Sequence, residues 1–390
     1  MIYLDNAATT RVSDKVLNSM LPYFQEHYGN PGSLHSAGRK AAEAISRARE
    51  QVANLLHCDP KQVVFTSGGT EGNNMVFKGL ANRLRELDKT HIVISAVEHD
   101  SVRRAAESLI ELGFDVSFAL PDDNGQVACS SVESVLRPNT GLVSVMHTNN
   151  ETGVVNHIAD IGDLCLSRDI LFHSDCVQAA GSSDLDVDKL HVDFATISSH
   201  KIHGPKGVGA VFIRDSELSP LISGGAEQEF GLRGGTENVP GIVGFGEACC
   251  EAYNDMAFAS LSVTMLKQEF VRKLIEILDN DRDVVAFNMN SHLSPGKILS
   301  ISIDGVFGET LVLMLDTLGI QISAGSACRS HESEPSEALI SYGLSPERAR
   351  NTVRLSFSSE NTQEQIRCAA TAFAMSVKTL RAAGLEGHYE

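Results

Sequence analysis

The sequence predicts an α/β fold in which a mostly parallel sheet of seven strands lies between helices, joined to a smaller α+β domain. Two observations support this. From Gln62 onward, short and nearly continuous apolar runs alternate with stretches of helical period, as expected for parallel strands covered on both faces. After Pro240 the pattern changes to long helices with a few strands, which indicates a second, differently built unit.

The first part of the chain supplies the elements of the large sheet. A helix is expected from about Ser13, and further helices over 75–87, 100–112 and 157–168. Seven runs are the strand candidates: VVFT (63–66), HIVIS (91–95), VSFAL (116–120), GLVSVM (141–146), ILFHS (170–174), FATIS (194–198) and VGAVFI (208–213).

The second part predicts one long or broken helix over 241–280 and a half-exposed antiparallel strand over 297–303, where apolar and polar residues alternate. Another helix (309–319), another strand (353–357) and a last helix (361–383) follow. We therefore expect a large domain over 16–258 and a small domain formed by 1–15 and 259–390. The Ser- and Gly-rich segment 323–335 is expected to be an exposed loop of the small domain.

Composition excludes several classes of protein. Of 390 residues, 42% are hydrophobic and 21% charged, which is ordinary for a globular protein. A net charge of −18 disfavours direct binding to nucleic acid. No apolar run is long enough to span a membrane, and the N-terminus does not resemble a secretory signal. The eight cysteines form no C-x-x-C pair, so we expect a reducing, cytoplasmic location and no metal site.

The segment TSGGTEGNN (66–74) follows a strand and opens a helix. Gly68 and Gly69 would let the backbone approach an anion, which the helix N-terminus and the Thr70 hydroxyl would hold. The segment is neither a dinucleotide fingerprint nor a P-loop. A plain strand-to-helix turn is an equally good interpretation.

Two further segments place polar groups at strand ends. HSDCVQ (173–178) closes a strand with Asp175, which would either pair with a protonated ring nitrogen or cap the next helix, and Gln178 would donate to a ring oxygen. SSHKIHGPKGVGA (198–210) contains Lys201 beside His200 and near Lys206. A lone lysine is usually a solvated charge, but this cluster favours a Schiff-base amine.

An anion cup, a pyridinium partner and an amine-bearing lysine together are what a protein needs to hold pyridoxal 5′-phosphate. His99, which follows the strand HIVIS, would stack on the cofactor ring and move protons. The alternative for His99 is a histidine with a purely structural role.

The chain resembles the cysteine desulfurases of the fold-type I, class V aminotransferase group. Ten segments in the family's order, spanning nearly the whole chain, carry this resemblance: YLDNAATT, GNPGSLH, VFTSGGTEGNN, VEHDSV, HTNNETG, HSDCVQ, SSHKIHGPKGVGA, RGGTENV, SAGSACRS and VRLSF.

The resemblance implies a role for each matching residue. Lys201 would bind the cofactor covalently, with His99 as acid and base. Asn150 and Arg354, with help from Asn30, would hold the substrate carboxylate. Thr236 would reach the cofactor phosphate of the other subunit, which implies a homodimer. The full set of cofactor-binding residues would be Gly69, Thr70, His99, Asp175, Gln178, Ser198, His200, Lys201 and Thr236.

The resemblance makes Cys328 the nucleophile that takes sulfur from L-cysteine, leaving L-alanine and a persulfide on the enzyme. The sulfur would then pass to an acceptor protein in iron–sulfur cluster assembly, tRNA thiolation or DNA phosphorothioation. Arg329 and His331, close to Cys328 in the sequence, would lower the pKa of its thiol. Ser199, Cys176 and Arg329 depart from the family pattern, and the role of Arg329 bears on the choice of acceptor.

Three functions remain open at this point. The first is a cysteine desulfurase. The second is another enzyme dependent on pyridoxal phosphate, such as a selenocysteine lyase, a β-lyase or an aminotransferase. The third is a scaffold for sulfur transfer without catalysis, which the presence of Lys201 and Cys328 disfavours.

Overall fold

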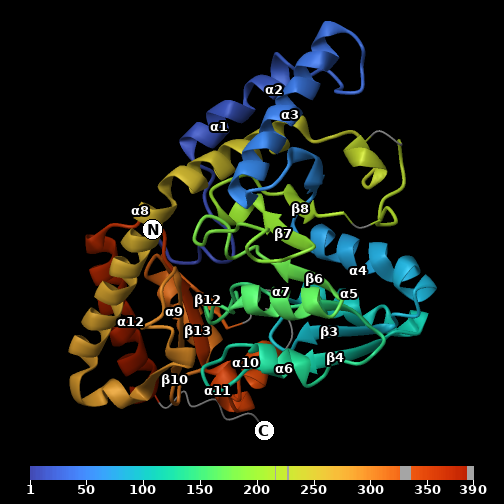
Figure 1. Cartoon of the computed structure of the whole chain (residues 1–390). Helices are drawn as coiled ribbons and strands as arrows, with labels where there is room; N and C mark the ends of the chain where they lie inside the picture. The colour runs from blue at the N-terminus through green and yellow to red at the C-terminus, as the bar shows by residue number, and fades with distance from the viewer. Residues whose placement is uncertain (216, 226–227, 326–334, 384–390) are drawn as a thin grey trace.

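The computed structural model describes residues 1–215, 217–225, 228–325 and 335–383. A seven-stranded sheet forms the centre of the larger part of the molecule (Figure 1). In their order across the sheet its strands are β2 (Val63–Thr66), β8 (Gly209–Ile213), β7 (Phe194–Ser198), β6 (Leu171–Asp175), β5 (Thr140–Ser144), β3 (His91–Ser95) and β4 (Asp115–Ala119). All seven predicted strands are therefore present.

The sheet is mostly parallel. Neighbouring strands from β7 through β6, β5 and β3 to β4 run parallel, whereas β8 is antiparallel to both β7 and β2. The five parallel strands bring their carboxyl ends to one edge, where ligands bind in open α/β sheets. The predicted α/β class is confirmed.

Helices cover both faces of this sheet. The helices of this part are α1 (Asp14–Met20), α2 (Pro22–Gln25), α3 (Ser36–Leu56), α4 (Gly69–Glu86), α5 (Asp100–Glu107), α6 (Cys129–Glu133) and α7 (Ile158–Ser167). Side chains of α3 and α7 join one hydrophobic cluster with strand residues such as Phe172. Side chains of α4 and α5 join another cluster with Phe194. Strand residues therefore alternate between two cores, as the continuous apolar runs predicted.

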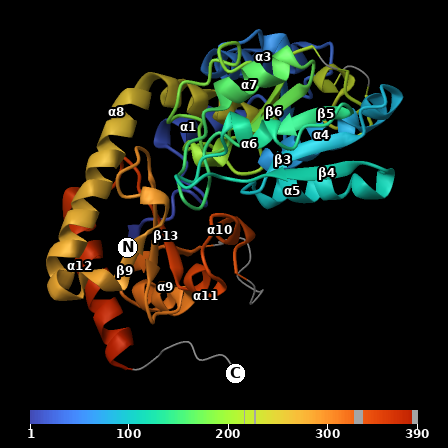
Figure 2. The same ribbon diagram turned by 60° about the horizontal axis from the view of Figure 1, so that its bottom comes forward.

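Helix α8 (Val239–Leu278) is a single element of 40 residues, about 60 Å long at 1.5 Å per residue. The sequence left open whether this helix is broken, and it is continuous. Its first half packs on α3 and its second half on α12 (Gln363–Ala382) (Figure 1 and Figure 2). The helix thus connects the large sheet with the C-terminal part of the chain.

The C-terminal part has its own core and a second sheet with the order β12 (Ser323–Ala324), β13 (Thr352–Ser356), β10 (Ile298–Ile303) and β9 (Val285–Phe287). Helix α9 (Gly308–Thr317) contributes to this core. Buried side chains of α10 (Glu337–Ser341) and α11 (Pro346–Arg350) instead join the cluster that α3 and α7 form on the large sheet. The hydrophobic cluster of the C-terminal part includes Leu4 and the second half of α8 from Val263 onward. The boundary between domains near 258 stays a prediction.

Two details of this part differ from expectation. Strand β10 is antiparallel as predicted, but all six of its residues are buried. Its polar face is covered because Ser300 and Ser302 contact Asn288, which also lies close to Thr352. The expected loop 323–335 begins with strand β12, which pairs with β13; residues 326–334 lie outside the described ranges.

None of the helices in the described ranges is long and apolar enough to cross a membrane. The chain begins with a short strand, β1 (Ile2–Tyr3), which pairs in parallel with β11 (Ile320–Gln321) of the C-terminal part. Residues 4–10 then run from that part toward the end of β7, where most of the predicted site residues lie.

Candidate active site

Three connections at the carboxyl edge of the large sheet carry the predicted cofactor-binding residues. Strand β2 leads through Gly68 into α4, strand β6 ends at Asp175, and strand β7 ends at Ser198. A single 3-10 turn over Ser199–Lys201 follows β7. Because β6 and β7 are adjacent and parallel, the strand pairing itself places Asp175 near the lysine turn.

The Asp175 carboxylate is almost fully buried and held on both oxygens. The main-chain N–H of Val177 donates to Oδ1 at 3.0 Å, and the side-chain amide of Asn73 donates to Oδ2 at 2.8 Å. Asn73 lies on α4 and is fully buried. It belongs to the glycine-rich segment, but no role was predicted for it, because nothing in the sequence links α4 to the end of β6.

His99 begins helix α5, where its Nδ1 accepts the main-chain N–H of Ser101 at 3.1 Å. The Ser101 hydroxyl lies 2.8 Å from the same nitrogen and 2.8 Å from the Asn73 amide. His99 and Asp175, predicted separately, are therefore joined through two intervening side chains.

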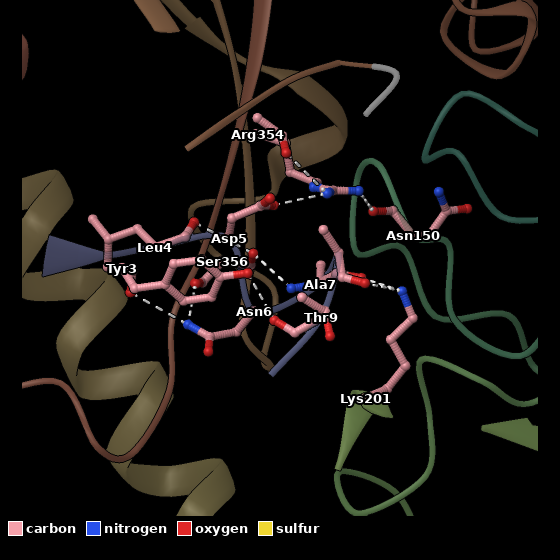
Figure 3. Close-up of polar contacts among 12 residues, drawn as sticks. Tyr3, Leu4, Asp5, Asn6, Ala7, Thr9, Asn150, Lys201, Arg354 and Ser356 are labelled. Carbon is pink, nitrogen blue, oxygen red and sulfur yellow. Dashed lines mark hydrogen bonds and ion pairs between the residues drawn. The ribbon is translucent and has the colours of Figure 1, made fainter. Parts of the chain in front are cut away.

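The amine of Lys201 donates to the main-chain carbonyls of Ala7 and Ala8, both at 2.7 Å (Figure 3). The side chain of Gln178 donates to the same Ala7 carbonyl at 2.9 Å. The N-terminal segment therefore passes directly over the lysine. This contact was not predicted from the sequence, because carbonyl acceptors leave no mark in an amino-acid sequence.

Positive charges gather around the lysine turn. Burial, together with Lys201, Lys206 and Lys297, lowers the pKa of His200 to about 4, so this imidazole is neutral at physiological pH. The amine of Lys297 donates to the main-chain carbonyl of Lys201 at 3.2 Å. Burial and the charges of Lys201 and Arg354 lower the pKa of Lys297 to about 7.

Two glutamates, Glu98 and Glu151, have raised pKa values. Burial, with a contribution from Asp175, raises the pKa of Glu98 well above its usual range, and Glu98 Oε1 accepts the N–H of Met146 at 2.6 Å. Burial raises the pKa of Glu151 to about 7, and its Oε2 accepts the Ser336 hydroxyl at 2.6 Å. Because its pKa is raised, Glu98 adds less negative charge beside Asp175 than an ordinary carboxyl group would.

The residues of this edge fit pyridoxal phosphate. Ser198 Oγ and Gln178 Oε1 are buried without a hydrogen-bond partner among the described residues, and buried polar atoms normally have one. Gly68 has a φ of +152°, and a Cβ added to Gly69 would lie 2.9 Å from Val177. Both glycines therefore keep the start of α4 close to Ser198, as an anion cup requires. Thr70 is exposed in the first turn of α4.

Arg354 and Asn150, the predicted carboxylate-binding pair, are in contact, but through the main chain of Asn150. Arg354 on β13 is buried and donates from Nη1 to the main-chain carbonyl of Asn150 at 2.8 Å and from Nη2 to Asp5 at 3.0 Å. The Asn150 side chain points away from the guanidinium group (Figure 3). Arg354 Nε is buried and has no hydrogen-bond partner in the described part of the chain. The structure thus adds Asp5, which the sequence patterns did not single out.

Two further predicted residues are exposed. Asn30 is exposed, and its side-chain oxygen accepts the N–H of Gly32 at 2.9 Å. Thr236 is exposed on the segment before α8, which Arg233 ties to Glu71 of α4 at 3.0 Å. Cys328 and Arg329 lie outside the described residues.

Two of the departures from the family pattern are buried. Cys176, directly after Asp175, is fully buried, and burial raises the pKa of its thiol to about 12. It is therefore an uncharged, space-filling thiol. Ser199 is also fully buried, and a Cβ at Gly204 would lie 2.0 Å from its hydroxyl. Ser199 thus packs tightly against the turn that follows Lys201.

Comparisons with known proteins identify the family of the chain. The family model "Aminotransferase class-V" matches residues 2–368. The cysteine desulfurase IscS of Anaeromyxobacter dehalogenans is 40% identical over 97% of this chain and 93% of its own length. A solved NifS-like protein is 33% identical with a TM-score of 0.89, over 97% of this chain and 100% of its own. The structure of "SspA in complex with cysteine" is 35% identical with a TM-score of 0.79, covering 93% of this chain and 100% of that one. The chain therefore belongs to the class-V aminotransferase family and, within it, to the cysteine desulfurases.

Proposed function

We propose that this enzyme binds pyridoxal 5′-phosphate at the carboxyl edge of the large sheet and converts L-cysteine to L-alanine. The sulfur atom is taken up by the thiol of Cys328 as a persulfide, so that one C–S bond breaks, one S–S bond forms, and the released carbon takes a proton. The observation that carries the proposal is the convergence at one sheet edge of the Lys201 amine, the buried Asp175 carboxylate and the Ser198 hydroxyl, which has no hydrogen-bond partner among the described residues.

The residues present would hold the cofactor in a defined orientation. Lys201 would bind its aldehyde, Asp175 would pair with the ring nitrogen, and Ser198, His200 and the start of α4 would bind the phosphate. When bound, the cofactor supplies an electron sink for bond breaking next to the substrate amine. Asn73 keeps Asp175 in place, and the carbonyls of Ala7 and Ala8 hold the lysine amine.

Arg354 would bind the substrate carboxylate. The guanidinium fork matches a carboxylate, and Nε, which has no partner within the described ranges, leaves one donor for it. Asp5 and the Asn150 carbonyl orient the group. The related SspA was solved in complex with cysteine, which supports cysteine as the substrate of this chain.

The test is the pair Cys328→Ser and Cys368→Ser. Cys368 is an exposed thiol on α12, so its variant is a matched control for loss of a thiol. Cys328→Ser should keep the visible absorbance of the bound cofactor and lose at least about a hundredfold of its alanine formation from cysteine. Cys368→Ser should resemble the parent protein. Normal turnover by Cys328→Ser, or purified protein without vitamin B6, would refute the proposal.

We further infer a homodimer in which Thr236 serves the partner's site. Large apolar side chains are exposed near the N-terminus, at Leu17, Leu21, Phe24, Tyr28 and Leu34, and exposed patches of this kind mark interaction surfaces. Light scattering of the holoenzyme measures this directly, and a monomer at micromolar concentration would contradict it.

We propose a protein as the sulfur acceptor, because the net charge of −18 opposes close approach of nucleic acid. Iron–sulfur cluster assembly, tRNA thiolation and DNA phosphorothioation are the candidate pathways, in a reducing cytoplasm where a persulfide-forming thiol persists. Enzyme loaded with ³⁵S-labelled cysteine and then mixed with host extract should label a protein band. Label found only on nucleic acid would contradict a protein acceptor.

A further inference from the structure

We propose that Ser101 and Asn73 are positioning residues that fix the proton of neutral His99 on Nε2. In this form His99 offers an N–H hydrogen bond from Nε2 rather than an open lone pair. The inference deepens the proposed function, on which it rests, by assigning the chemical character of the histidine that the sequence predicts to stack on the cofactor ring.

A chain of contacts links four side chains. The Asn73 amide nitrogen lies 2.8 Å from Asp175 Oδ2 and 2.8 Å from Ser101 Oγ. Ser101 Oγ lies 2.8 Å from His99 Nδ1. Asn73 is fully buried and Ser101 nearly so.

The orientation of the Asn73 amide follows from Asp175. Oδ1 of Asp175 already accepts the main-chain N–H of Val177, and an ionised carboxylate can only accept. The amide atom that faces Oδ2 must therefore be the nitrogen, because the amide oxygen would leave two acceptors in contact. Both hydrogens of this nitrogen are then used, one by Asp175 and one by Ser101.

The hydroxyl of Ser101 is oriented in turn. Its oxygen accepts from Asn73, so its single hydrogen is left for His99 Nδ1. The main-chain N–H of Ser101 donates to the same Nδ1 at 3.1 Å. Two donors therefore converge on Nδ1, and one of them is a backbone group that cannot reverse its role.

A neutral imidazole carries one proton, and the hydrogen bonds at one ring nitrogen decide where it sits. With Nδ1 accepting twice, the proton belongs on Nε2. A proton on Nδ1 would face the hydrogen of the Ser101 main-chain N–H, so that two donors would be in contact. The Ser101 hydroxyl could then no longer donate to Nδ1. Asp175, which the proposed function pairs with the cofactor ring nitrogen, is thus the origin of an ordered set of hydrogen bonds that ends at His99.

The test observes the tautomer itself. Holoenzyme carrying ¹⁵N-labelled histidine is examined by long-range ¹H–¹⁵N correlation, and the His99 signals are identified by their loss in His99→Gln. The expected spectrum has a protonated Nε2 and an unprotonated Nδ1 for the neutral ring. A protonated Nδ1 in the parent protein would overturn the inference.

Substitutions at Ser101 separate positioning from packing. Ser101→Ala removes one of the two donors, so the Nδ1 resonance of His99 should move and kcat should fall about fivefold, the effect of one lost hydrogen bond. Ser101→Thr keeps the hydroxyl, so both the Nδ1 resonance of His99 and kcat should stay close to those of the parent protein. The control is Ser108→Ala, whose hydroxyl binds the carbonyl of Ala105 instead. If Ser101→Ala leaves the His99 resonances unchanged, Ser101 has no positioning role.

The outcome is separable from that of the proposed function. The tautomer is read from the spectrum and needs no turnover, whereas the desulfurase assignment depends on Cys328. Asn73→Ala is a second variant, in which the Ser101 hydroxyl is free to turn and a second His99 tautomer should appear. Its thermal unfolding is compared with the parent protein, and if it does not fold, the Ser101 variants decide.

Discussion

The residues predicted for the site fall into two groups that the structure treats differently. Asp175 ends β6, Ser198 ends the adjacent parallel strand β7, and Lys201 lies in the turn that follows, so the pairing of β6 with β7 sets their positions. Asn30 and Thr236 lie on exposed segments outside the sheet. The sheet fixes the first group, whereas the second group lies on exposed connections whose positions no strand pairing sets. Substitutions in the two groups should therefore differ in the size of their effects.

The largest effect is expected at Lys201, in the group fixed by the sheet. Lys201→Ala removes the amine that the carbonyls of Ala7 and Ala8 hold, and activity should fall by more than about a thousandfold. Borohydride treatment followed by peptide mapping should mark the peptide containing Lys201 in the parent protein and nothing in the variant. A labelled peptide elsewhere in the chain would contradict the assignment.

The second effect is expected at Arg354. Arg354→Met keeps much of the side-chain volume and removes the charged donors, so the KM for cysteine should rise roughly 10- to 100-fold through loss of charge-assisted hydrogen bonds. Arg214→Met is the control, because this arginine binds Asp188 near the opposite end of the sheet strands. An unchanged KM in Arg354→Met would mean that this guanidinium group only anchors Asp5.

A third prediction concerns His173, buried in β6 between the hydroxyls of Ser144 and Thr196 at 2.8 and 3.1 Å. Burial lowers its pKa to about 3, below the value of about 6.5 in an unfolded chain. Between these pH values only the unfolded chain binds the proton, so stability is lost as pH falls through this window, by up to about 1.4 kcal/mol per pH unit.

His173→Asn should therefore lower stability at pH 7 but flatten its decline toward pH 5, as measured by urea unfolding. His157→Asn, at an exposed histidine, should leave the slope unchanged. An equally steep decline in His173→Asn would show that other groups account for the acid sensitivity.

The smallest effects are expected in the exposed group. Thr236→Ala should weaken retention of the cofactor about fivefold, the effect of one hydrogen bond, if the residue reaches the partner's phosphate. Asn30→Ala should change kcat/KM by about twofold at most, because its side-chain oxygen already binds the N–H of Gly32. Equilibrium dialysis and steady-state kinetics measure these changes. A loss as large as that of Lys201→Ala at either position would remove the distinction between the two groups.

Much of the fold was predictable because strands buried on both faces leave continuous apolar runs, such as 91–95 and 194–198. Helix α3 was not predicted, since four of its nine buried positions are alanines, such as Ala41 and Ala48, and another is a glycine, which gives little contrast with the polar face. The buried polar face of β10 was also missed. Alternation in a sequence shows which side chains share a face, and the contacts of Asn288 that cover that face depend on the whole fold.

The sequence by itself determined the strands, the glycines before α4 and the chemical types of the residues at the sheet edge, because these follow from local patterns and from motif order. Only the tertiary structure decided that Asn73 holds Asp175, that Asp5 holds Arg354 and that the carbonyls of Ala7 and Ala8 receive Lys201. Each of these contacts joins groups about a hundred or more positions apart. Hydrogen bonds across such separations form only after packing has brought the segments together, so no local pattern encodes them.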